Sequence, residues 1–254
     1  MAWIDDIITP TIPYHRQVTK QFPYTSSEGT DNVRYIMTWF RMAYPGCRYK
    51  ALAAMCGCFN GESRLNPAAI LGFRDYAYLF ANRKKAFGIV QFVPGCLPRD
   101  HDEQYWQNYH GNGKPIFYYY LKNKGLGTDI NTLYTDTGYA TDLRVQLQYI
   151  SDGNGWKRQT STSYNPVYNK SYTGSFRDFL FDETQDLGNT AAWFYAGFIR
   201  SGGPSTALPA YIRFANGVYD KFVSEFGDDV PIPPKPITPP TTKFIIIAKA
   251  SGLF

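Results

Sequence analysis

Residues 49–67 constrain the fold most, because an apolar helical pattern there carries one carboxyl group on its buried face. Apolar side chains recur at spacings of three and four, which predicts one buried helical stripe: Leu52, Met55, Cys56 and Phe59. Glu62 lies three residues after Phe59 and continues this stripe. Asn66-Pro67 predicts the helix end, since the residue before a proline avoids helical angles. We therefore expect Glu62 in the last turn, against an apolar wall.

A carboxyl group in that position is suited to acid catalysis. The negative end of the helix dipole and the apolar surroundings both favour its protonated form, so we expect the pKa of Glu62 to be raised. A general acid needs this shift, because it must hold a proton near neutral pH and give it to a leaving oxygen, as glycoside cleavage requires. A solvated glutamate at a helix end is the alternative.

A second element follows at Phe87-Gly88-Ile89-Val90-Gln91-Phe92. The glycine at position 88 would let the backbone approach a sugar closely. Gln91 could orient a water molecule or hold an N-acetyl group, and structural hydrogen bonding is its alternative role. Together with Glu62, this element is the strongest chemical signal in the sequence.

These segments resemble, in order, the lysozyme-like domains that bacteriophages carry on their tails, and more distantly goose-type lysozymes and soluble lytic transglycosylases. The resemblance covers residues 31–225. Its parts are an opening helix at 31–40, a helix with the ending Glu-Ser-x-Leu/Ile-Asn-Pro at 51–67, the Gly/Gln element at 87–92, and two later helices at 143–150 and 191–198, the second followed by Gly202-Gly203-Pro204.

The resemblance implies a mainly α (α+β), lysozyme-like orthogonal helical domain with a small β-hairpin beside a cleft, near residues 74–78. It puts Glu62 in the catalytic position and implies cleavage of the β-1,4 bond of peptidoglycan, by a muramidase-type hydrolase or a lytic transglycosylase. It also implies substrate contacts from Phe92 and Tyr195, with packing as the alternative role of Tyr195. Asp75, in the presumed hairpin, is the candidate second carboxylate, and the acetamido group of the substrate is the alternative.

Two positions depart from the pattern of that family. Gly61 stands directly before the acid, where the family usually has methionine, and a glycine loosens the last helical turn. Phe92 stands where tryptophan is common. Because of Gly61 and of termini suited to docking, a catalytically inactive structural or wall-binding tail component remains the alternative to an enzyme.

The amino-acid composition limits the kinds of partner that we expect this protein to bind. With 44% hydrophobic and 17% aromatic residues, 254 residues can bury a large core. The 26 Lys and Arg against 21 Asp and Glu give a net charge of +5, which would attract an anionic wall polymer. No nucleic-acid-binding motif accompanies this charge, so we expect no nucleic-acid partner. We also expect no cofactor and no metal, since Cys56 and Cys58 are two apart on a helix and match no zinc pattern.

The cysteines leave two alternatives open. A disulfide could join Cys47 to Cys58 or to Cys96. An amidase that uses Cys96 with His101 or His110 is a rival enzyme class, although their spacing is not a catalytic motif.

The ends of the chain predict appendages. Residues 1–30 predict an extended arm that either docks onto a neighbour or lies as a strap over its own domain. Residues 31–226 form the expected catalytic domain, 227–243 a Pro-rich linker, and 244–254 an apolar docking strand too short to span a bilayer. No cleavable signal peptide is visible. With the resemblance, these features imply a virion protein of the phage tail tip or knob, which contacts other tail proteins and acts on glycan strands of the host wall.

Overall fold

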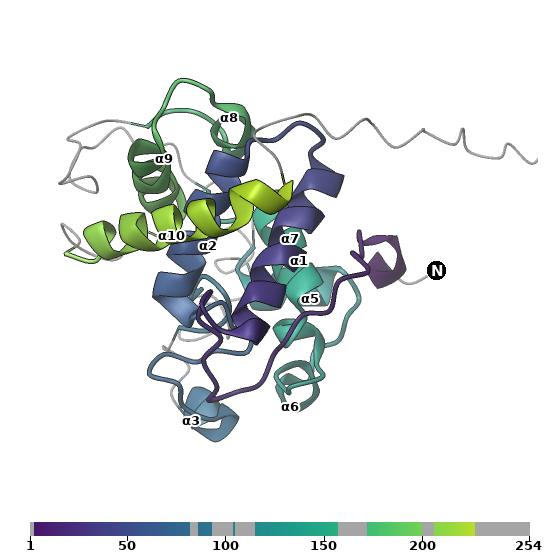
Figure 1. Ribbon diagram of the computed structural model, residues 1–254. Coiled ribbons are helices and arrows are strands. Elements are labelled where there is room, and N and C mark those ends of the chain that lie inside the picture. The colour runs from purple at the N-terminus through teal and green to yellow at the C-terminus, as the bar shows by residue number, and fades with distance from the viewer. Residues whose placement is uncertain are drawn as a thin grey trace, which may run out of the picture.

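Figure 1 shows a computed structural model of the chain, which describes residues 3–81, 86–92, 104, 115–156, 172–199 and 206–226. The described part is mainly helical, so the expected mainly α class is confirmed. Its elements are η1 (Trp3–Asp6), α1 (Ser27–Ala43), α2 (Tyr49–Ser63), α3 (Tyr76–Ala81), α5 (Phe117–Asn123), α6 (Ile130–Leu133), η2 (Tyr139–Thr141), α7 (Leu143–Ser151), α8 (Phe176–Phe181), α9 (Leu187–Phe194), the π-helical turn η4 (Tyr195–Ile199) and α10 (Leu208–Phe226).

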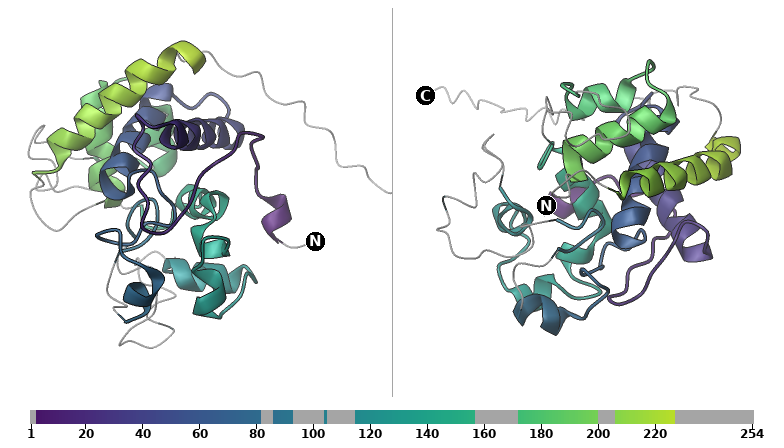
Figure 2. Two further views of the ribbon diagram at one scale, coloured as in Figure 1. Left: turned by 60° about the horizontal axis from the view of Figure 1, so that its bottom comes forward. Right: turned by 90° about the vertical axis from the view of Figure 1, so that its left-hand side faces the viewer.

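Helix α2 lies at the centre of the fold, between α1, α9 and α10 (Figures 1 and 2). The predicted stripe of apolar residues on α2 is buried, as expected. The other faces are buried too, because every residue from 51 to 60 is covered by neighbouring elements. Small side chains such as Ala53 and Ala54 let those elements approach from all sides.

Helix α10 crosses α2 at two glycines. A Cβ atom on Gly57 would lie 2.5 Å from the backbone nitrogen of Ala215, and one on Gly61 would lie 2.1 Å from the ring of Tyr211. These glycines are one helical turn apart and therefore share a face of α2. The absence of side chains on that face lets α10 pack directly against the acid-bearing helix.

The N-terminal arm is a strap over its own domain throughout residues 7–25, which was one of the two alternatives. It turns back near α3 and returns to the start of α1 (Figure 1). Arg16 donates to the carbonyl oxygen of Gly138 at 2.9 Å, and the backbone nitrogen of Val18 donates to Asp136 at 2.8 Å. Ser26 ends the strap and caps α1, where its hydroxyl accepts from the backbone nitrogen of Gly29 at 3.0 Å.

The β-hairpin expected near residues 74–78 does not form there. Helix α3 begins at Tyr76 instead, because its residues pack with helical spacing: Leu79 is buried, and the rings of Tyr76 and Phe80 stack at 6.5 Å. Where the structure describes both partners, strand pairing consists of isolated antiparallel bridges, from Ile70 to Phe87 and from Phe87 to Phe92.

One of the two disulfides considered is not formed. Cys58 is a free, fully buried thiol whose Sγ lies 3.9 Å from the carbonyl oxygen of Ala191, so it is not bonded to Cys47. Burial raises the pKa of the Cys58 thiol well above its usual range, which keeps it protonated.

Several expectations fall on residues outside the described part. These are the linker at 227–243, the docking strand at 244–254, and the cysteine and histidines of the amidase alternative, Cys96, His101 and His110. Of the helices that the structure describes, none combines the length and the apolar character needed to span a membrane.

Candidate functional site

Glu62 lies in the last turn of α2, as predicted, and is half-buried. The helix ends at Ser63, earlier than Asn66-Pro67 suggested. Arg64 caps it in the left-handed conformation, with φ 52°, and Leu65 is left-handed as well, with φ 60°. Two successive left-handed residues that are not glycine are uncommon and need support from their surroundings. The chain therefore turns sharply directly after the acid, in a conformation that neighbouring elements must hold.

A tyrosine from α10 binds the acid. The hydroxyl group of Tyr211 donates to Oε1 of Glu62 at 2.6 Å. Burial raises the pKa of Glu62 above its usual value, and the hydrogen bond from Tyr211 acts in the opposite direction. Burial and the nearby Glu62 also raise the pKa of Tyr211, so the phenol keeps its proton and remains the donor. A neutral Glu62 then carries its proton on Oε2, the oxygen that Tyr211 does not bind.

This contact explains the glycine before the acid. The ring of Tyr211 occupies the space that a side chain on Gly61 would need, 2.1 Å from the Cβ position. Gly61 therefore provides the space for the phenol that reaches Glu62. Sequence reasoning did not identify Tyr211 as a site residue. The signal that could have found it is the pair Gly57 and Gly61, since two glycines one turn apart indicate a close helix crossing.

The structure brings the Glu-Ser segment and the Gly/Gln element together. The hydroxyl group of Ser63, which follows the acid, lies 2.8 Å from the carbonyl oxygen of Ile89. Gln146 of α7 joins the same two segments: its Oε1 accepts from the backbone nitrogen of Ile89 at 2.8 Å, and its Nε2 donates to the carbonyl oxygen of Pro67 at 2.7 Å. All of these polar groups are buried, so the two motifs form one rigid unit.

Gln91 lies at the end of the Gly/Gln turn, in the left-handed conformation with φ 51°. Its Nε2 lies 3.2 Å from the carbonyl oxygen of Ala69 and 3.1 Å from that of Gly88, so the amide folds back onto its own turn. Its Oε1 is buried and accepts no hydrogen bond within the described part of the chain. The structural role thus accounts for the amide nitrogen of Gln91 and leaves the amide oxygen with unused accepting capacity.

Gly88 is required by the turn itself. It is buried with φ 85°, and a Cβ atom there would lie 2.9 Å from the ring of Phe92 and 3.0 Å from Oε1 of Gln146. The close approach that the sequence predicted at this glycine is therefore made by the protein's own side chains.

Phe92 and Tyr195, which were expected to contact the substrate, are packed inside the protein. Phe92 is buried, stacks on Phe117 at 4.9 Å and meets the edge of Tyr149 at 5.2 Å. Tyr195 is fully buried at the start of the π-helical turn η4, and its ring centroid lies 5.8 Å from that of Tyr211. Packing, rather than contact with a sugar, is what the structure shows for both rings.

Asp75 lies apart from these contacts. It is exposed, and its carboxylate accepts from the backbone nitrogen of Tyr78 at 2.8 Å, in the first turn of α3. In the described part of the chain, no set of three His, Cys, Asp or Glu side chains could hold a metal ion.

No protein-family model matches this chain, and no curated protein matches its sequence. The resemblance to phage tail lysozymes therefore stays a prediction, supported by the residues of this chain alone.

Proposed function

We propose that this protein cleaves the β-1,4 glycosidic bond of peptidoglycan, with Glu62 as the general acid. The observation that carries the proposal is a half-buried carboxyl group whose pKa is raised by burial and which binds a phenol through one oxygen. A carboxyl group of this kind can hold a proton near neutral pH and release it to a leaving oxygen. The contact between Ser63 and Ile89 supports a lysozyme-like arrangement, because it joins the two motifs in the order of that family.

In the proposed reaction, Oε2 of Glu62 gives its proton to the bridging oxygen of the glycan. The negative charge that remains on the carboxylate accepts the hydrogen bond from Tyr211 more strongly than the neutral acid does. Tyr211 thereby stabilises the product of proton transfer more than the starting state, which is the condition for a contribution to catalysis.

The second carboxylate is not supplied by Asp75 in this proposal, because the side chain of Asp75 is exposed and caps α3. No other carboxyl group of the described residues contributes to the shift of Glu62. We propose that the substrate's own acetamido group takes the place of a second carboxylate. Mass spectrometry of released muropeptides identifies the product, since a reducing end and a 1,6-anhydro end differ by one water.

Loss of turbidity of purified cell walls tests the acid. Glu62→Gln keeps the size of the side chain and an oxygen for Tyr211 but has no acidic proton, so we expect clearing to slow by about 10²- to 10⁴-fold. Glu28→Gln is the matched control, because Glu28 is exposed in the first turn of α1. Equal clearing by wild type and Glu62→Gln would overturn the assignment.

We place this activity at the phage tail tip or knob, where the net charge of +5 would favour contact with an anionic wall. The partners we propose are glycan strands, and other tail proteins through the C-terminal segment, with no nucleic acid and no cofactor; the arm, expected as a second docking element, is bound to its own domain instead. The inactive-component alternative drew on Gly61. The contact of Tyr211 with this glycine gives it a role compatible with activity.

A further inference from the structure

We propose that the N-terminal strap positions Glu62, with Asn66 and Tyr24 as the positioning residues. The role of Glu62 as an acid rests on the proposed function. The strap touches both helices that meet at this residue. It holds the turn after Glu62 on α2, and it holds α10, which carries Tyr211.

The first hold acts on the turn that comes directly after the acid. Asn66 is fully buried, and its Nδ2 lies 2.8 Å from the carbonyl oxygens of Gln17 and of Lys20, both in the strap. An amide nitrogen carries two protons, so Asn66 can donate to both. The backbone nitrogen of Phe22, also in the strap, donates to the carbonyl oxygen of Arg64 at 3.0 Å. The strap thus binds residues 64 and 66, immediately beyond the end of α2.

Asn32 of α1 adds to this hold. Its Nδ2 donates to the carbonyl oxygen of Leu65 at 2.8 Å and to that of His15 in the strap at 2.9 Å, and its Oδ1 accepts from the backbone nitrogen of His15 at 2.6 Å. The side chain is fully buried. One asparagine therefore fixes the strap and the turn after Glu62 to the same helix.

The conformations in this region need such support. Arg64 and Leu65 are left-handed, and Thr19, between the two strap residues that Asn66 binds, has φ 71°. A left-handed β-branched residue is an outlier for steric reasons, and such residues persist only where surrounding contacts over-determine them. The hydrogen bonds between the strap and the turn after Glu62 supply such contacts, both for Thr19 in the strap and for the left-handed residues of the turn.

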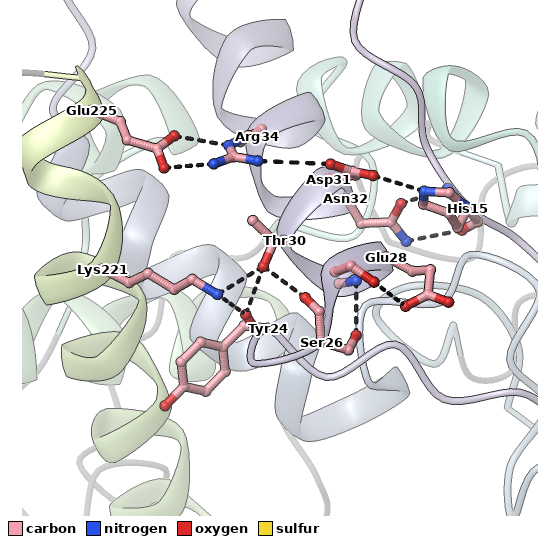
Figure 3. A network of polar contacts seen from close by, with 12 residues as sticks. His15, Tyr24, Ser26, Glu28, Thr30, Asp31, Asn32, Arg34, Lys221 and Glu225 are labelled. Atoms are coloured by element: carbon pink, nitrogen blue, oxygen red, sulfur yellow. Dashed lines mark hydrogen bonds and ion pairs between the residues drawn. The ribbon is translucent and has the colours of Figure 1, made fainter.

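The second hold acts on α10. Tyr24 packs against this helix, since a Cβ atom on Gly217 would lie 2.2 Å from the tyrosine's hydroxyl oxygen and 2.8 Å from the ring atom Cζ. The Nζ of Lys221 donates to the carbonyl oxygen of Tyr24 at 3.0 Å (Figure 3). On its other side, the backbone nitrogen of Tyr24 donates to Oδ1 of Asn60 on α2 at 3.1 Å. Tyr24 therefore bridges α2 and α10, whose residues Glu62 and Tyr211 make the hydrogen bond at the site.

Polar contacts from α1 also bind the C-terminal part of α10 (Figure 3). Arg34 of α1 donates to both carboxylate oxygens of Glu225 at 2.8 Å and 2.7 Å, and Lys221 also donates to Thr30 at 2.7 Å. The start of α1 lies directly after the strap, so α10 is held by the strap and by the helix that the strap leads into. Displacement of the strap would release the turn after Glu62 and α10 together, and the hydrogen bond between Glu62 and Tyr211 would open.

Hydrogen exchange measured by mass spectrometry tests this device on the full chain. The variants are Tyr24→Ala, which removes the packing on Gly217, and Asn66→Asp, which keeps an acceptor for the backbone nitrogen of Ala68 but loses both donors to the strap. We expect exchange in residues 60–66 and 208–215 to accelerate by about tenfold in both variants. Tyr24→Phe keeps the ring and should restore wild-type exchange.

Arg16→Ala is the control within the strap. Arg16 bonds to Gly138 and Thr141, which are not part of either hold on the acid, so exchange should change there and stay unchanged in residues 60–66. Equal acceleration at residues 60–66 in Arg16→Ala, or no acceleration there in Tyr24→Ala and Asn66→Asp, would overturn the proposal.

Wall-clearing kinetics separate this proposal from the proposed function. A misplaced acid lowers kcat, and we expect a loss on the order of 10- to 100-fold in Tyr24→Ala with KM unchanged, restored in Tyr24→Phe. A rise in KM at unchanged kcat would contradict a positioning role. If the wild-type protein clears no walls, the proposed function fails, and the exchange measurements still decide whether the strap holds Glu62 and Tyr211 together.

Discussion

Glu62 and Glu225 occupy the same position in two helices that pack together, since each is the next-to-last residue of its helix, α2 or α10. Their surroundings differ. Burial raises the pKa of Glu62, whereas the hydrogen bonds from Arg34 lower the pKa of Glu225. The partner of Glu62 is a neutral phenol, and that of Glu225 is a guanidinium group at the surface. A position at a helix end therefore does not by itself make a glutamate a general acid. Burial and the charge of its hydrogen-bond partner determine whether its pKa is raised or lowered.

Among the variants that test the difference between Glu62 and Glu225, Gly61→Ala should have the largest effect, because its methyl group would need the space that the ring of Tyr211 occupies. We expect the free energy of unfolding to fall by about 1–3 kcal/mol, because an added methyl group in a packed crossing forces the helices apart. Wall clearing should fall with it by about 100-fold, since the acid is displaced. Urea denaturation and the turbidity assay measure the two effects.

A double-mutant cycle provides the control. Adding Tyr211→Ala to Gly61→Ala removes the ring that the new methyl group meets, so the double variant should lose less free energy of unfolding than the sum of the two single variants. Strict additivity of the two changes would show that the ring of Tyr211 is not what Gly61 accommodates.

The crossing of α2 and α10 shows which features could be predicted from the sequence and which could not. The helical stripe of Leu52, Met55 and Phe59 located α2, and the position of Glu62 in its last turn followed from spacing alone. These predictions succeed because they depend on contacts within one helix. Tyr211 lies 149 positions from Glu62, and no local pattern connects the two. Only the spacing of Gly57 and Gly61 in α2 indicates that another helix packs closely against them.

The other differences between the expectations and the structure have the same cause. Asp75 and the hairpin were assigned from resemblance, but residues 76–81 carry rings at helical spacing, and packing of Tyr76 on Phe80 forms α3. The substrate contact of Phe92 was likewise implied by the resemblance. Its burial depends on Phe117 and Tyr149, in segments whose position a one-dimensional pattern does not give.

Tyr211→Phe should have the next largest effect, because it removes only the donor to Glu62. The hydrogen bond lowers the pKa of Glu62 against the effect of burial, so its loss should raise that pKa and move the alkaline limb of the pH–rate profile to higher pH. The rate should fall by about tenfold, as expected for a hydrogen bond to a charged group. Tyr139→Phe, at an exposed tyrosine, is the control. An unchanged alkaline limb would contradict the coupling.

The pH dependence of stability should differ in sign between the two glutamates. With a raised folded-state pKa, Glu62 contributes stability that is fully present below its unfolded-state pKa and is lost as the pH rises through the folded-state pKa. With a lowered folded-state pKa, Glu225 contributes stability that is present above its unfolded-state pKa and is lost as the pH falls through the folded-state pKa. As the pH rises above about 4, near the unfolded-state pKa of a glutamate, Glu62→Gln should gain stability relative to wild type, whereas Glu225→Gln should lose stability relative to wild type as the pH rises up to about that value. Urea denaturation at several pH values would disprove this if both variants followed the same trend.

The smallest effect should come from Arg34→Met, which replaces the guanidinium group and keeps an apolar stem near the ring of Phe222. Because the side chains of Arg34 and Glu225 are 37% and 38% exposed, the loss should be only about 0.2–1 kcal/mol in the free energy of unfolding. In 1 M salt the difference should shrink further, since the screening length falls to about 3 Å. The effect of Tyr211→Phe on the pH–rate profile should persist in the same salt, because a buried hydrogen bond is screened much less than a surface ion pair. If salt removed both effects equally, Glu62 would be as solvent-accessible as Glu225, and the difference in burial that separates the two glutamates would not exist.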